Sequence, residues 1–152
     1  MREITLKSVV GFHEHVQSYG RQSIIYRGVS NKDYELIPKI GRLGLRGDQL
    51  KRSERMLIER FKREALPHLD FQPIDDWDWI SVAQHHGVPT RLLDWSHSAL
   101  VAAFFAVEDT RDFDAAVYAY RLNYFIDRQI EPNPFSGNSL IQNFTRNTSH
   151  RE

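Results

Sequence analysis

The chain has 152 residues, of which 41% are hydrophobic, 26% charged and 12% aromatic, a composition that argues against a disordered protein. Its 20 basic and 20 acidic side chains balance, so no global field favours nucleic acid or an anionic membrane. The absence of cysteine excludes disulfides, cysteine-ligated zinc and a thiol nucleophile.

We expect a single domain over residues 1–152, a length that buries roughly two thirds of the unfolded surface. The first residues contain no continuous apolar run of the kind a signal peptide needs, which predicts a cytoplasmic protein. From residue 123 the pattern weakens, and residues 123–152 are expected to form a weakly structured tail.

The first half of the chain predicts a helix, a strand and a second helix. Residues 6–19 are expected to be a helix ended by Gly20, because apolar side chains recur at helical spacing: Val9, Phe12, Val16 and Tyr19. Residues 23–27 have the β-branched and aromatic pattern of a strand. Residues 53–65 predict a helix capped by Ser53. Basic residues outnumber acids around this helix, which is typical of a solvated face, with phosphate or nucleic-acid binding as the alternative.

The second half predicts two helices and a strand. Residues 79–86 are expected to form a helix that Asp78 caps and Gly87 ends, with Ile80 and Ala83 pointing inward. Residues 99–107 are apolar nearly all round, which predicts a buried helix too short to span a membrane. Residues 115–122 alternate as a strand does. These elements predict an α+β fold, in which a small, mostly antiparallel sheet packs on the buried helix, with N-terminal helices.

Two short motifs hold the residues expected to carry function. The first is Tyr26-Arg27-Gly28, where the arginine offers a planar fork of donors and the glycine permits close backbone approach. The arginine is expected either to bind a ligand or to pair with a structural carboxylate such as Asp94.

The second motif is HHGVPTRLLDWS, which ends just before the apolar helix. Asp94 or Ser96 is expected to cap that helix. His85 and His86 come at the end of the preceding helix, where the helix dipole favours the imidazolium form. Adjacent histidines point apart, so no metal site is expected here.

Between these two motifs lie the segment YELIPKIGR and the helix around Glu54. With these four features in this order, the sequence resembles the FRG domain family. That family is named for its (F/Y)-R-G motif and carries a later H-(Y/F)-G-x-P-T-R-L-L-D-(W/F)-(T/S) block, and the likeness runs from about Tyr26 to Ala106. The resemblance implies a bacterial or phage origin and little settled function. It also implies a further C-terminal portion with a Gln-Gly-containing motif. Either this chain is a shortened form or a fragment that lacks this portion, or the sequence IQNFT is a degenerate remnant of it.

The order of elements is also similar to that of ADP-ribosyltransferases of the Arg-Ser-Glu type. This resemblance implies that NAD is the substrate, that Arg27 holds it, and that Thr90 or Ser96 is the strand hydroxyl. The glutamate of those enzymes has no clear counterpart, because residues 115–122 contain no acid and Glu131 lies in an expected loop. No other cofactor is implied.

Two functions therefore stay open. One is a nucleotide-type pocket, ADP-ribosyltransferase-like, and the other is a non-catalytic binding or regulatory module for a nucleotide or protein partner. In the second, arginines and Asp94 form a structural ion network. The expected catalytic residues are His86 and Asp94, and the expected substrate-binding residues are Tyr26, Arg27, Gly28, Thr90, Arg91 and Trp95.

Overall fold

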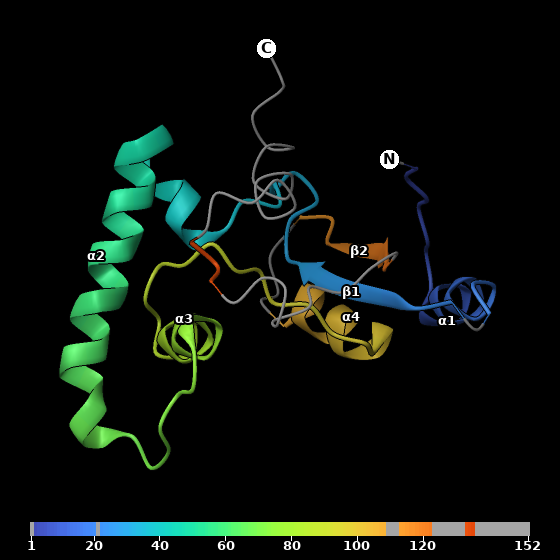
Figure 1. Ribbon diagram of the computed structural model, residues 1–152. Coiled ribbons are helices and arrows are strands. Elements are labelled where there is room, and N and C mark those ends of the chain that lie inside the picture. Colours follow the sequence, from blue (N-terminus) through green and yellow to red (C-terminus); the bar gives the residue numbers. More distant parts are fainter. Residues whose placement is uncertain (1, 21, 109–112, 123–132, 136–152) are drawn as a thin grey trace. The chain divides into compact units, whose positions relative to one another are not determined.

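A computed structural model of the chain describes residues 2–20, 22–108, 113–122 and 133–135 (Figure 1). Helices and two antiparallel strands make up an α+β fold, as predicted. In chain order the elements are α1 (Val9–Gln17), β1 (Ile24–Val29), the 3-10 helix η1 (Lys39–Leu43), α2 (Gly47–Ala65), the 3-10 helix η2 (Leu66–His68), α3 (Asp76–His85), α4 (Ala99–Val107) and β2 (Ala116–Arg121).

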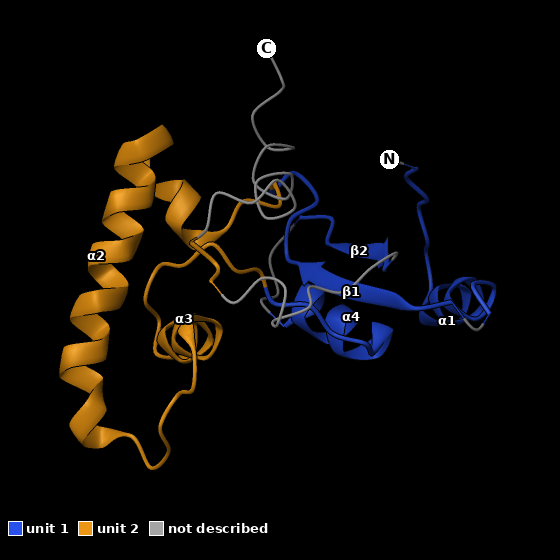
Figure 2. Cartoon of the chain, in the orientation of Figure 1, with its two compact units in different colours: residues 1–34, 94–125 blue, residues 35–93, 126–152 orange. Residues whose placement is uncertain are grey.

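The chain divides into two compact units, each described here by itself (Figure 2). Unit 1 contains residues 1–34 and 94–125, and unit 2 contains residues 35–93 and 126–152. The single domain stays a prediction, and most of the predicted tail, 123–152, lies outside the described residues.

In the described part of the chain, no helix combines the length and apolar character needed to cross a bilayer. The cytoplasmic location stays a prediction.

Unit 1 is built on β1, which pairs with β2 on one side and packs against α4. The pairing is antiparallel, with Gly28 opposite Val117 and Ile24 opposite Arg121. The buried core of the unit is Ile24, Tyr26, Ala99 and Ala102. The predicted apolar face of the first helix packs on this core through Phe12, Val16 and Tyr19, whereas Val9 is exposed.

α4 has the predicted bounds but is not buried on all sides. Its buried residues are the small ones at one face, Ala99, Ala102 and Ala106. The exposed ones are Leu100, Val101, Phe104, Phe105 and Val107. A helix that is apolar all round gives no sequence signal for the face that packs. Here the alanine side packs on β1, because small side chains let the strand approach closely.

Unit 2 is organised by the packing of α2 against α3. Its buried apolar core is Ile58 from α2 with Ile80 and Ala83 from α3, and the last two were expected to point inward. α2 begins at Gly47, so the predicted start at Ser53 is wrong. The additional first turns are polar and mostly exposed, and they therefore carry little apolar periodicity.

The caps of two helices also differ from the predictions. α3 is capped by Asp75, whose carboxylate accepts a hydrogen bond from the Asp78 amide at 2.9 Å. α4 is capped by Ser98, whose hydroxyl accepts from the Val101 amide at 3.3 Å. Asp78, Asp94 and Ser96 are therefore not the caps, because a cap must directly precede the first helical residue.

Candidate functional site

Arg27 lies on the face of the β1–β2 sheet that points away from α4. Successive side chains of a strand point to opposite faces, and Ile24 and Tyr26 are buried against α4. Arg27 therefore projects from the other face, where Tyr118 is its partner across the ladder. Tyr120, two residues further along β2, shares that face.

The segment that carries Asp94 and Trp95 runs along the other edge of β1. Tyr26 and Ser96 exchange two backbone hydrogen bonds, at 2.7 and 2.8 Å, in an antiparallel bridge. The guanidinium of Arg27 reaches this segment and donates from Nη1 to the carbonyl oxygen of Asp94 at 2.5 Å. The predicted link between the two motifs therefore includes a bond to the backbone of Asp94.

Aromatic residues share this face of the sheet with Arg27. The Trp95 ring lies 6.2 Å from the Tyr120 ring, centre to centre, with a tilt of 55° between them. The Tyr118 hydroxyl donates to the carbonyl oxygen of Tyr34 at 3.2 Å, which fixes its ring. We call Arg27, Trp95, Tyr118 and Tyr120 the Arg27 face. It joins a cationic fork to flat rings, a combination suited to a phosphate group attached to a planar ring system.

The two tyrosines of this face were not among the predicted site residues. The alternating sequence Val-Tyr-Ala-Tyr of β2 places both on one side of the strand, so alternation was the signal that could have found them. Their position beside Arg27 depends on the register of β2 on β1, which spacing alone does not give.

The other residues of the first motif serve the core of unit 1. Tyr26 is 7% exposed, and its burial, together with the charge on Tyr19, raises the pKa of the phenol. Gly28 faces α4 so closely that a Cβ atom there would lie 1.8 Å from the Ala102 carbonyl oxygen. This glycine allows the close backbone approach that the sequence suggested.

In unit 2 the second motif is held by a buried ion pair between Arg91 and Glu54. Glu54, on α2, is 2% exposed. One of its carboxylate oxygens, Oε2, accepts from Nη2 and Nε of Arg91 at 2.5 and 2.9 Å, and the other, Oε1, accepts from the Arg91 amide at 2.8 Å. Nη1 donates to the carbonyl oxygen of Pro134 at 2.6 Å. This guanidinium is therefore paired within unit 2, with a partner that the sequence did not indicate.

Thr90 is also buried and hydrogen-bonded within unit 2. The residue is 1% exposed, and its hydroxyl donates to the Gln84 side-chain oxygen at 2.6 Å. Its backbone oxygen accepts from the Ile40 amide at 3.3 Å. Lys39 donates from Nζ to the carbonyl oxygen of Gly87 at 2.6 Å, so η1 and the second motif are tied together at both places.

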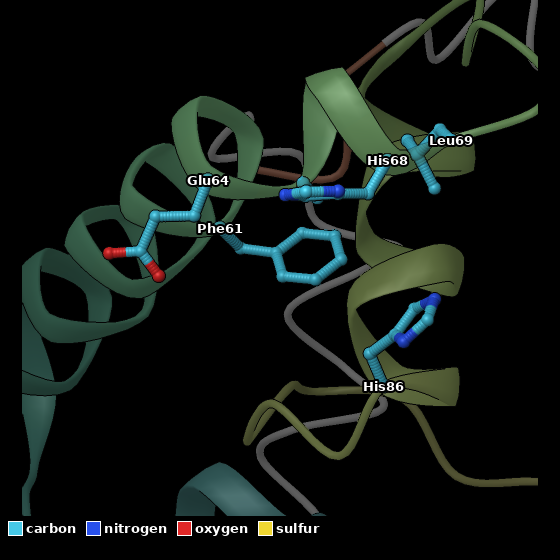
Figure 3. Close-up of a pocket in the computed structure, with 6 residues that line it drawn as sticks. Phe61, Glu64, His68, Leu69 and His86 are labelled. Atoms are coloured by element: carbon cyan, nitrogen blue, oxygen red, sulfur yellow. The ribbon is translucent and has the colours of Figure 1, made fainter.

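His86 is the C-cap of α3 and borders a hollow of about 250 Å³ (Figure 3). Its ring lies 5.7 Å from that of Phe61, centre to centre. In Figure 3 the carboxylate of Glu64 points away from the rings of His68 and His86. Across the residues that the structure describes, no three potential ligands gather closely enough to hold a metal ion.

The predicted site residues are thus divided between the units. Unit 1 brings together five of them: Tyr26, Arg27, Gly28, Asp94 and Trp95. His86, Thr90 and Arg91 belong to unit 2, where Thr90 and Arg91 are neighbours in a polar network and His86 lies at the hollow.

Among known protein families, the model of the FRG domain matches residues 22–115, well over half of the chain. No curated protein matches the sequence, and no solved structure does. The predicted likeness to ADP-ribosyltransferases stays a prediction.

Proposed function

The chain belongs to the FRG domain family, and from this premise we propose that the Arg27 face binds a nucleotide of the NAD type. The observation that carries the proposal is the position of Arg27 on the sheet face turned away from α4. It lies across the ladder from Tyr118 and shares the face of Tyr120, whose ring lies 6.2 Å from that of Trp95. Its bond to the Asp94 carbonyl oxygen orients the guanidinium on this face.

Phosphate recognition is the part that Arg27 would supply. A guanidinium carries five N–H donors in a planar fork, which matches the oxygens of a pyrophosphate. Each hydrogen bond to a charged group contributes about 1.5 to 3 kcal/mol. Removing the arginine should therefore weaken binding by at least tenfold.

The rings would supply contacts to the planar parts of the ligand. Tyr120 is 38% exposed, and Trp95 and Tyr118 are half-buried, so parts of all three rings are accessible. Stacking of a base on an aromatic side chain contributes about 1 to 3 kcal/mol. Trp95 would stack on the nicotinamide or adenine ring.

If the protein transfers ADP-ribose, the bond between nicotinamide and ribose breaks and an acceptor nucleophile forms a new bond to the same carbon. Nicotinamide leaves with the bonding electrons, and positive charge develops on the ribose. The carboxylate of Asp94 would stabilise that charge. β2 contains no acid, so the proposal assigns this role to Asp94 and to no residue of that strand.

Calorimetric titration of the full chain with NAD tests the proposal, with Arg27→Ala as the variant. We expect saturable binding by the wild type and at least a tenfold loss in the variant. Arg121→Ala is the matched control, because it removes a guanidinium from the same sheet at a position that shares the face of Ile24. Equal affinity in both variants, or no binding by the folded wild type, would refute the NAD proposal.

Release of nicotinamide from bound NAD separates the two functions that the sequence left open. Binding with release supports the transferase, and binding without release supports the non-catalytic module. The non-catalytic alternative also included a structural ion network. The pairing of Arg91 with Glu54 supports such a structural role for Arg91 in unit 2. We therefore base the nucleotide proposal on unit 1, and substrate contacts of His86, Thr90 and Arg91 stay predictions.

A further inference from the structure

α2 presents a row of arginines on the side opposite its packed face. Ile58 and Glu54 are buried, so the residues about half a turn away from them face solvent. Exposed side chains on that side include Arg52, Arg55 and Arg63. We call these three arginines the basic face of α2. With a rise of 1.5 Å per residue, they extend over about 16 Å of the helix.

Within the part of the chain that the structure describes, these three arginines have no acidic partner, unlike the other basic residues of the helix. Lys51 pairs with Asp48, Arg60 with Glu64, and Lys62 with both Glu59 and Asp76. Over the residues that the structure describes, no ion pair or hydrogen bond engages the side chains of the basic face.

The helix carries an excess of positive charge although the whole chain is neutral. Gly47–Ala65 contains six basic and four acidic side chains. One of the four acids, Glu54, is buried and neutralised by Arg91. The basic face therefore produces a local positive potential, which the balanced total charge conceals.

The chemistry of this face fits a polyphosphate better than a lipid surface. Membrane-surface helices insert an apolar face, but the apolar side of α2 is packed against Ile80 and Ala83 of α3. Along the exposed side the large apolar residue is Met56, which is 71% exposed. The exposed side chains of α2 include no aromatic ring on which single-stranded bases could stack.

We propose that the basic face of α2 binds the phosphate backbone of double-stranded nucleic acid without reading its sequence. About 16 Å corresponds to roughly five nucleotide steps along one strand, enough for three separate phosphate contacts. Such contacts position a protein on a duplex and carry no base information. This surface belongs to unit 2, so the inference does not depend on nucleotide binding by the Arg27 face.

Salt-dependent binding of the full chain to a fluorescently labelled duplex of arbitrary sequence tests the proposal by anisotropy. Three phosphate contacts predict a slope of about −2.7 in log affinity against log salt, so affinity falls about 40-fold between roughly 50 and 200 mM salt. The triple variant Arg52→Gln, Arg55→Gln, Arg63→Gln should bind at least tenfold more weakly at the lower salt, with a slope near zero. Glutamine has a helix propensity close to that of arginine, so the variant should retain α2, which circular dichroism verifies.

The matched control removes three exposed basic residues from unit 1: Arg2→Gln, Lys7→Gln and Arg121→Gln. It changes the total charge by the same amount and should keep the wild-type slope. Arg27→Ala should bind the duplex as the wild type does, which distinguishes failure of this inference from failure of the nucleotide proposal. Equal losses in the control and the α2 variant, no binding at low salt, or tighter binding to phosphatidylserine vesicles than to the duplex would overturn the inference.

Discussion

Replacing Gly28 by alanine tests the close contact between β1 and α4. A Cβ atom at this position would lie 1.8 Å from the Ala102 carbonyl oxygen and 2.7 Å from the Ala106 amide nitrogen, whereas ordinary contacts begin at 3.4 Å. Both obstacles are backbone atoms of a helix, which cannot rotate away as a side chain can. The strand and the helix must therefore move apart.

That separation disturbs the core of unit 1, because Ile24 and Tyr26 of β1 pack on Ala99 and Ala102 of α4. Inserting a methyl group into a well-packed core costs about 1 to 3 kcal/mol. Since relaxation has to move whole elements, we expect the free energy of unfolding to fall by about 3 kcal/mol, a large part of the roughly 5 to 15 kcal/mol of a typical domain.

Urea unfolding followed by circular dichroism measures the effect, and hydrogen exchange of β1 and α4 peptides locates it. Gly11→Ala is the matched control in the same unit, because its Cβ would meet only the Ser8 hydroxyl, at 3.2 Å. An alanine inside a helix is favoured over glycine by about 0.5 to 1 kcal/mol, so this control should stay close to the wild type. If Gly28→Ala also stays within about 0.5 kcal/mol of the wild type, the packing argument is wrong.

Three further changes probe the polar and titrating groups of the cores. Glu54→Ala leaves the Arg91 guanidinium without its buried partner and should lower the free energy of unfolding, measured in urea, by about 3 to 5 kcal/mol. Thr90→Val removes the bond to Gln84 and should cost about 1 to 3 kcal/mol, whereas Thr90→Ser should cost less; equal costs would contradict this. Burial raises the pKa of Tyr26 above its usual 10.0, so the folded chain holds that proton more tightly than the unfolded chain. The resulting stability is complete below pH 10 and is lost as pH rises through the raised pKa; Tyr26→Phe should reduce this alkaline loss in urea titrations, and an unchanged profile would refute it.

Periodicity located the elements of this fold well where one face is apolar and the other polar. The inward positions of α3, Ile80 and Ala83, were predicted from spacing and are fully buried. The first turns of α2 were not predicted, because Gly47 and its polar neighbours are typical of a turn. The cap of α4 was not predicted either. Suitable side-chain oxygens occur at Asp94, Ser96 and Ser98, and the local sequence does not distinguish among them.

The motifs themselves were visible in the sequence, but their partners were not. Glu54 lies 37 residues from Arg91, and its acid is one of several on a charged helix. Only the packing of unit 2 selects it over its neighbours. In the same way, the register of β2 decides that Tyr118, and not Tyr120, faces Arg27 directly.

The residues of the two motifs have different structural roles. Gly28 and Arg91 are explained by contacts inside their own units, so substitutions there should change stability first and binding only as a consequence. Arg27 projects from the sheet face opposite the core cluster, and removing it opens no cavity against α4. Arg27→Ala should therefore change the free energy of nucleotide binding more than the free energy of unfolding. Arg91→Ala should change the free energy of unfolding more than that of binding. Measuring both quantities for each variant on the same samples decides whether Arg27 recognises a ligand or only supports the fold.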